Sequence, residues 1–168
     1  ARGARAGAPG QRGPVTEVRV GTVDVYVVHA GAPAWRVLTL QRASAGTRCP
    51  NAWETVHGTL EEGETPEEGA VRELREETGL APSRLYSVTV QPFYLHRMRT
   101  VQLAVVFCAF VESEEVVLGP EHQRHEWPSV DEAGSRLVWP GERGALREIE
   151  IVLANGDAGP VEDVLRVV

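Results

Sequence analysis

Three glutamates in the middle of the chain are spaced so that they can act together on one metal ion. Glu73, Glu76 and Glu77 stand at positions i, i+3 and i+4, and in an α-helix such positions project within an arc of about 100°. Like charges this close on one helix face repel each other. A hard divalent cation such as Mg²⁺ removes that repulsion, because it binds about six oxygen ligands and accepts carboxylates. The spacing therefore favours a metal site over a solvated acidic surface.

The segment that carries these glutamates has clear signals for the start and the end of a helix. Thr65 stands before Pro66, and Glu68 follows three residues after Thr65, which is the pattern of a capping box with proline at the first helical position. Gly79 fits the position just after the last turn. The sequence therefore predicts a helix over residues 66–78. The residues expected to face the core share one helical stripe: Ala70, Val71, Leu74 and Thr78.

The charge and composition of the chain exclude several classes of protein. Its net charge is −7, and the segment 61–77 alone holds eight acids and two arginines. No basic stripe is available to neutralise phosphates, so we expect no duplex nucleic-acid partner. No run of about 18 apolar residues occurs, so we expect no membrane span. The 168 residues, 42% of them apolar, fit one compact domain.

Outside this helix, alternating and apolar segments predict several strands and two more helices. Residues 15–29 are typical of a strand, with the alternative that the chain turns back near Gly21 as a hairpin. Further strands are predicted at residues 35–41, 53–56, 85–93, 99–112, 116–118 and 126–127. The other predicted helices cover residues 129–136 and 140–153. Strands and helices on one core indicate an α+β layered fold.

The N-terminal segment and the two cysteines bear on where the domain begins and where the protein works. Residues 1–14 are rich in Ala, Gly, Arg and Pro and lack the apolar stretch of a secretory signal. We expect them to form a flexible leader before a single domain over residues 15–168. Cys49 and Cys108 have no partner at metal-ligand spacing. Free thiols in a cytoplasmic protein are therefore expected, with one disulfide as the alternative.

The residues from Gly58 to Leu80 resemble the Nudix box. That box reads G-x5-E-x7-R-E-U-x-E-E-x-G-U, where U is apolar, and the chain matches it at every fixed position. The matching residues are Gly58, Glu64, Arg72, Glu73, Leu74, Glu76, Glu77, Gly79 and Leu80. The resemblance implies the Nudix fold, an α/β/α sandwich with a mixed central sheet. It also implies a pyrophosphohydrolase that cleaves a nucleoside diphosphate linked to another group, X.

The resemblance also assigns roles to residues of the box. It implies Mg²⁺ or Mn²⁺ ions that bridge the pyrophosphate and activate a water for attack on phosphorus. The implied metal ligands are three side chains and one backbone carbonyl: Glu73, Glu76, Glu77 and that of Gly58. Glu64 and Arg72 would pair across the turn before the helix and orient the metal-binding carboxylates.

A further glutamate is expected from a later loop, as a metal ligand or a general base. The candidates are Glu121 and Glu126, in the stretch Pro120-Glu-His-Gln-Arg-His-Glu-Trp127. The pattern E-H-x4-W, from Glu121 to Trp127, is similar to one in the dihydroneopterin triphosphate and diadenosine polyphosphate branches of the family, where that glutamate comes close to the metals. This favours Glu121. Two solvated loop acids are the alternative reading of the pair.

Three other residues are candidates for contacts with the substrate. Arg42 ends a predicted strand and can reach a phosphate, and His57 stands next to the first glycine of the box. Arg97 lies between two predicted strands, where a phosphate- or base-contacting loop is one interpretation. A structural histidine and an exposed hairpin end are the alternatives for His57 and Arg97.

The substrate class is only weakly indicated. The lead-in from Trp53 to Glu64 looks like that of the dihydroneopterin triphosphate pyrophosphatase branch, which favours a nucleoside or pterin triphosphate that loses pyrophosphate. Dinucleoside polyphosphates or nucleotide sugars are the alternative substrates. A non-catalytic nucleotide-binding module of the same fold and an isopentenyl diphosphate isomerase are alternatives of other classes. Dimers are frequent among relatives, so a homodimer stays open.

Overall fold

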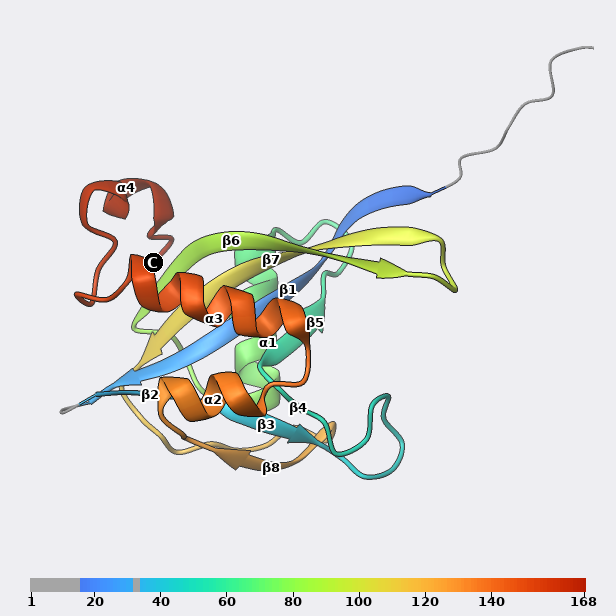
Figure 1. Cartoon of the computed structure of the whole chain (residues 1–168), viewed down its shortest axis with the longest axis horizontal. Coiled ribbons are helices and arrows are strands. Elements are labelled where there is room, and N and C mark those ends of the chain that lie inside the picture. Colours follow the sequence, from blue (N-terminus) through green and yellow to red (C-terminus); the bar gives the residue numbers. More distant parts are fainter. Residues whose placement is uncertain (1–15, 32–33) are drawn as a thin grey trace, which may run out of the picture.

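The computed structural model describes residues 16–31 and 34–168, and Figure 1 shows a twisted sheet with helices on both of its faces. The predicted leader at residues 1–14 lies outside the described residues. None of the helices in the described part of the chain has the length and apolarity needed to cross a membrane. Cys49 is exposed and Cys108 is buried, and both are free thiols, as expected.

The larger sheet is built around one long central strand. Its strands are β1 (Glu17–Ala30), β2 (Trp35–Val37), β5 (Val56–Thr59), β6 (Arg84–Leu95) and β7 (Thr100–Val111). Along one edge β1 pairs in parallel with β7, which pairs antiparallel with β6. Along its other edge β1 pairs antiparallel with β5 and then with β2. The predicted mixed central sheet is therefore confirmed.

A smaller antiparallel sheet and five helical segments complete the described part of the fold. The small sheet has the order β4-β3-β8 and contains β3 (Thr39–Arg42), β4 (Trp53–Glu54) and β8 (His122–Glu126). The helical segments are α1 (Pro66–Thr78), α2 (Val130–Arg136), α3 (Pro140–Val152), η1 (Gly159–Val161) and α4 (Glu162–Leu165). Strands and helices thus pack together in one α+β fold, as predicted.

Two apolar clusters hold the helices to opposite faces of the larger sheet. Val23 and Val25 face one cluster, which includes Leu74 of α1. Tyr26 faces the other cluster, which includes Ile149 of α3. Because successive side chains of a strand point to opposite faces, β1 must be apolar at every position where both faces are covered. The run Val23 to Val28 meets this demand except at Asp24.

Helix α1 begins and ends where the sequence predicts. The Thr65 hydroxyl accepts from the backbone N–H of Glu68 at 3.4 Å, and the Glu68 carboxylate accepts from the N–H of Thr65 at 2.9 Å. Gly79 has φ 72° and closes the last turn, a conformation that costs glycine little. The stripe predicted to face the core does so, since Ala70, Leu74 and Thr78 are buried.

Two predicted strand features are wrong. The chain does not turn back near Gly21, because β1 has partners along both edges and only a bulge lies between Val20 and Thr22. Residues 116–118 are not a strand. This segment forms a backbone hydrogen bond with the end of helix α1 instead: the N–H of Val117 donates to the carbonyl of Thr78 at 2.9 Å.

Candidate functional site

Helix α1 lies very close to strand β5. The Glu73 side chain of the helix occupies the space where a side chain at Gly58 of the strand would lie. A Cβ atom on Gly58 would collide with the carboxyl group of Glu73. Only glycine permits this approach, because any other residue would push the Glu73 carboxyl away. The fold therefore brings Glu73 directly over the backbone of Gly58.

Glu77 is the most buried carboxylate of the helix. It is 8% exposed, and its Oε2 atom has no hydrogen-bond partner. Burial, followed by the charges of Glu73, Glu54 and Glu121, raises the pKa of Glu77 to about 9. Glu76, by contrast, keeps 60% of its side chain exposed. The exposure of the three glutamates therefore decreases from Glu76, through the partly buried Glu73, to the buried Glu77.

Arg72 ties the helix to the loop that precedes it. Its Nε and Nη2 atoms donate to the two oxygens of Glu64 at 2.8 and 2.9 Å, which is the pair expected from the sequence. This bidentate contact is the main cause that lowers the pKa of Glu64 to about 2. Nη1 also donates to Glu73 at 2.8 Å and to Glu76 at 3.2 Å, which the sequence did not indicate.

The donors around α1 fit a hard divalent cation. Within residues 16–31 and 34–168 no three acidic, histidine or cysteine side chains already converge on one metal position, since Arg72 holds Glu73 and Glu76. Two observations nevertheless support the fit: the partnerless buried oxygen of Glu77 and the carboxyl of Glu73 above Gly58. The donors are all oxygen atoms, which suits Mg²⁺ or Mn²⁺.

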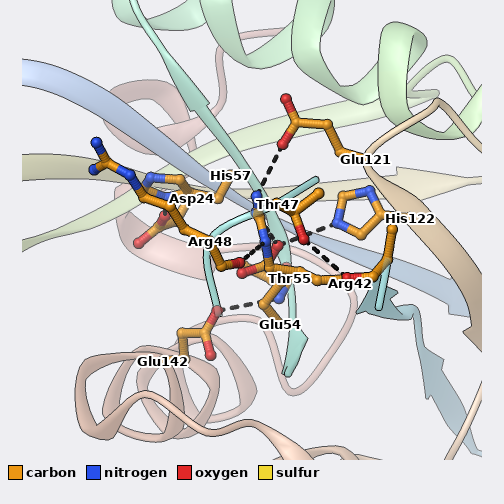
Figure 2. A network of polar contacts seen from close by, with 11 residues as sticks. Asp24, Arg42, Thr47, Arg48, Glu54, Thr55, His57, Glu121, His122 and Glu142 are labelled. Carbon is orange, nitrogen blue, oxygen red and sulfur yellow. Dashed lines mark hydrogen bonds and ion pairs between the residues drawn. The ribbon is translucent and has the colours of Figure 1, made fainter. Parts of the chain in front are cut away.

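A second charged network lies between the small sheet and the loop before β8, and Figure 2 shows its members. Arg42 donates to Glu54 at 2.7 Å and to Glu121 at 3.0 Å. The Nε2 atom of His122 lies 3.1 Å from the same oxygen of Glu54. Burial alone would raise the pKa of Glu54, but the contacts with His122 and Arg42 outweigh it and lower the pKa. Arg42 thus holds Glu121 next to a buried, ionised glutamate.

The two candidate loop glutamates have different surroundings. Glu121 lies close enough to Glu77 for its charge to raise the pKa of Glu77. Glu126 is held by Arg136 of α2 and by Arg124, whose Nη2 lies 2.6 Å from it. The structure therefore brings Glu121, and not Glu126, to the acidic residues of α1.

A group of polar side chains lies on the face of the larger sheet that α3 covers. We call Thr22, Asp24, His57 and Gln102 the polar floor. The Nδ1 atom of His57 lies 2.6 Å from Asp24, and Thr22, Asp24 and Gln102 are 7%, 9% and 8% exposed. Thr22 Oγ1 and Gln102 Oε1 have no hydrogen-bond partner. Buried polar atoms without partners are rare in proteins and call for an explanation.

An aromatic ring approaches the polar floor from the far strand. Phe93 on β6 pairs with Gln102 in register, and its ring centroid is 6.4 Å from that of His57 on β5. Burial would lower the pKa of His57, but its contact with Asp24 and the nearby acids raise it overall. His57 is therefore positioned by Asp24 on one side and an aromatic ring on the other.

Arg97 lies apart from these groups. It belongs to the turn between β6 and β7, where the N–H of Glu17 at the start of β1 donates to the carbonyl of Arg99 at 3.1 Å. Gly58 pairs with Val23 of β1, and this row is about 16 Å further along the sheet from Glu17 at 3.3 Å per residue. The structure does not bring Arg97 to the other candidates.

Asp24, Glu54 and Gln102 were not predicted as site residues from the sequence. Asp24 interrupts an apolar strand that is buried on both faces, and Gln102 interrupts the long apolar run of β7. That interruption was a readable signal, because a polar side chain in such a strand needs a partner. Glu54 had no such signal, since Arg42 and His122 reach it from distant parts of the chain.

Most of the chain matches one known protein family. The NUDIX domain family matches residues 18–149. A Myxococcus xanthus protein named octanoyltransferase is 34% identical over 129 residues, which are 75% of this chain but 35% of that protein. The chain therefore spans about a third of that relative.

Two further relatives match over nearly their whole length. The dihydroneopterin triphosphate diphosphatase of Escherichia coli (strain K12) is 26% identical over 147 residues, which are 77% of this chain and 92% of that protein. Its solved structure superposes with a TM-score of 0.62. The structure of a Nudix-type protein from Listeria monocytogenes gives a TM-score of 0.69 at 25% identity and covers 82% of this chain and 97% of that one.

Replacement of Glu77 by glutamine should stabilise the metal-free protein at neutral and mildly alkaline pH. The pKa of Glu77 in the folded state, about 9, lies above its unfolded value of about 4.3. Folded protein with Glu77 therefore loses stability as the pH rises between these values, and glutamine removes that loss. In EDTA, we expect the melting temperatures of Glu77→Gln and the unchanged protein to agree near pH 4 and to separate by pH 8.

The same variant should respond less to metal. Mn²⁺ at pH 8 should raise the melting temperature of the unchanged protein more than that of Glu77→Gln. The variant has a neutral amide in place of a negatively charged metal ligand and so binds the ion more weakly. Glu67→Gln, an exposed change on the same helix, is the matched control and should behave like the unchanged protein. A Glu77→Gln variant that melts lower than the unchanged protein in EDTA at pH 8 contradicts this account.

Replacement of Gly58 by alanine should weaken metal binding while the protein stays folded. The added methyl group takes the space of the Glu73 carboxyl, so we expect Mn²⁺ affinity to fall at least about tenfold, as when a ligand is misoriented. Titration calorimetry measures the affinity. Gly144→Ala is the control, because nothing lies within 4 Å of a Cβ there. Equal affinities in the two variants would rule out the proposed position of Glu73.

Proposed function

This chain belongs to the NUDIX domain family, and from that premise we propose that it is a metal-dependent hydrolase of a nucleoside or pterin triphosphate that releases pyrophosphate. The observation that carries the proposal is the position of Glu77. Its buried carboxylate has a partnerless oxygen and lies near both Glu73 and Glu121. Strongly perturbed pKa values cluster at functional sites, where burial and neighbouring like charges act together as they do on Glu77.

The residues that would hold the metal come from one helix, one strand and one loop. They are Glu73, Glu76, Glu77, Glu121 and the backbone carbonyl of Gly58. Bound Mg²⁺ or Mn²⁺ would neutralise charge on the phosphates and activate a water. Arg72 keeps its bidentate hold on Glu64 and so fixes the helix relative to the loop. Arg42 positions Glu121 and carries a positive charge toward the substrate phosphates.

The polar floor supports a ring that carries an amino group next to a ring N–H. Asp24 uses one oxygen for His57, which leaves the second oxygen as an acceptor. Gln102 Oε1 and Thr22 Oγ1 lie unpaired on the same face. A floor rich in acceptors suits the adjacent N–H and NH₂ donors of guanine or a pterin, whereas adenine offers only one amino group on its pairing edge. Phe93 supplies a ring for stacking.

The comparisons support the same substrate class without deciding it. The E. coli relative named for dihydroneopterin triphosphate matches over 92% of its length, and it acts on a pterin triphosphate by its name. The box residues that bind metal in this family are all present here. A catalytic protein is therefore the better proposal than a non-catalytic binding module.

A product assay tests the proposed reaction. The chain would be incubated with Mg²⁺ and a panel of dihydroneopterin triphosphate, the four ribonucleoside triphosphates, ADP-ribose, a dinucleoside polyphosphate and nucleotide sugars. We expect turnover of the triphosphates with release of pyrophosphate rather than phosphate, and none in EDTA. Selective turnover of nucleotide sugars, ADP-ribose or dinucleoside polyphosphates would overturn the triphosphate assignment. No turnover at all would favour a binding module.

Replacement of Asp24 by asparagine tests the polar floor. Asparagine can still contact His57, but it cannot accept two N–H donors as a carboxylate does. We expect kcat/KM to fall about 10- to 100-fold for GTP and dihydroneopterin triphosphate. This is the loss in transition-state binding expected when one hydrogen bond to a charged group is removed. The loss should be smaller for ATP and CTP. Asp131→Asn, on the surface of α2, is the control. An equal loss for all substrates would refute selective recognition by Asp24.

A further inference from the structure

The loop between β3 and β4, residues 43–51, is tied to the segment that carries Glu121. Gln123, two residues further along that segment, contacts both ends of the loop. Its Oε1 atom accepts from the N–H of Ser44 at 3.1 Å, and its Nε2 atom donates to Oδ1 of Asn51 at 2.9 Å. The loop therefore has a fixed position relative to Glu121.

Two residues of this loop have a backbone conformation that glycine adopts more easily than they do. The φ angles of Cys49 and Asn51 are 52° and 64°, in the left-handed region. Asparagine tolerates this region, but cysteine has no such preference. Backbone strain of this kind persists only where the surroundings impose it, and it is concentrated at functional sites. The shape of the loop is thus set by its tertiary contacts, as in a binding loop.

Arg42, which the sequence suggests as a phosphate contact, already has partners for its guanidinium. Nη1 donates to Glu54 at 2.7 Å, Nη2 to Glu121 at 3.0 Å, and Nε to the carbonyl of Arg48 at 2.7 Å. The side chain of Arg42 is only 14% exposed. Two carboxylates therefore balance its charge, and it offers a phosphate less than a free arginine would.

Arg48 is the free cation that this arrangement brings to the candidate site. Its carbonyl and the Glu121 carboxylate both accept from the guanidinium of Arg42, so one planar group separates them. The Arg48 side chain is exposed, and no carboxylate in the described part of the chain forms an ion pair with it. In Figure 2 it extends from the loop toward the side of the network where Asp24 and His57 lie.

We propose that Arg48 binds a phosphate oxygen of the substrate, an inference that rests on the proposed function. A triphosphate brings several negative charges to a site that already holds glutamates, and a free cation beside the site reduces this repulsion. Arginine suits this role, because its guanidinium can donate two hydrogen bonds to one phosphate. A ring on the polar floor near Asp24 would put its phosphates between Arg48 and helix α1.

Arg48→Gln tests the contact by its effect on KM. The change removes a charge from an exposed side chain and keeps the backbone carbonyl that Arg42 binds. We expect KM to rise about tenfold or more for GTP, ATP and CTP alike, with kcat nearly unchanged, because a phosphate contact is common to all three. Arg48→Lys should recover part of the loss, since it keeps the charge. Arg147→Gln, on the exposed side of α3, is the matched control.

Titration calorimetry with the α,β-methylene analogue of GTP and Mn²⁺ separates this inference from the proposed reaction. The analogue carries three phosphorus groups but resists cleavage between the first two. We expect Arg48→Gln to bind it about tenfold more weakly than the unchanged protein and Arg147→Gln. That result supports the inference even if no triphosphate is turned over, which would refute the proposed hydrolysis alone.

Three results would overturn the assignment of Arg48. The first is equal affinity of Arg48→Gln and the unchanged protein for the analogue. The second is a rise in KM confined to GTP, which would place Arg48 against the ring. The third is no binding of the analogue by the unchanged protein, which would refute the proposed function as well.

Gln123→Ala tests whether the loop positions Arg48. The change removes the contacts with Ser44 and Asn51, so we expect KM to rise about threefold with kcat nearly unchanged. The effects of Gln123→Ala and Arg48→Gln should combine to less than their product, because both act through one contact. Fully multiplicative effects would contradict positioning by the loop. Circular dichroism checks that each variant folds.

Discussion

The close approach of helix α1 to the backbone on two sides is the constraint on which the candidate site depends. On one side Gly58 of β5 leaves room for the Glu73 carboxyl, and on the other a Cβ on Gly119 would lie 2.7 Å from the carbonyl oxygen of Glu76. There is therefore no room for even one methyl group between helix α1 and the backbone at Gly58 or Gly119. At Gly119 the contact is between two backbone segments, so side-chain flexibility cannot relax it. A site that must hold ligands within tenths of an ångström needs such rigid support.

This rigidity concentrates acids in the interior, and they are stabilised to different degrees. Glu54 has Arg42 and His122 as partners, and its pKa is lowered despite burial. Glu77 and Glu142 lack a cation, and burial raises their pKa values to about 9 and about 8. A buried carboxylate without a cation costs stability in its charged form. Glu54 is therefore ionised in the folded protein. The charged form of Glu77 would be stabilised by a bound cation.

The sheet separates two kinds of surface by the alternation of its side chains. Gln102 belongs to the polar floor, and its neighbour Leu103 lies on the opposite face of the sheet, where Val105 packs on the α1 cluster. Because a strand alternates with a period of two, adjacent residues of β7 contribute to a buried polar group on one face and to apolar packing on the other. The bulge between Val20 and Thr22 keeps β1 in step with this alternation, since Val20 pairs with Leu103 and Thr22 pairs with Ala104.

The sequence by itself determined the features that depend on local contacts. The capping box, the C-terminal Gly79 and the core stripe of α1 were all readable, because each involves residues within a few positions of one another. The mixed layers also followed from strand and helix patterns. Only the tertiary structure decided which later glutamate lies near Glu77 and that Asp24, His57 and Gln102 share a face. Those contacts join segments 30 to 80 residues apart, and chain closure over such distances leaves no local pattern in the sequence.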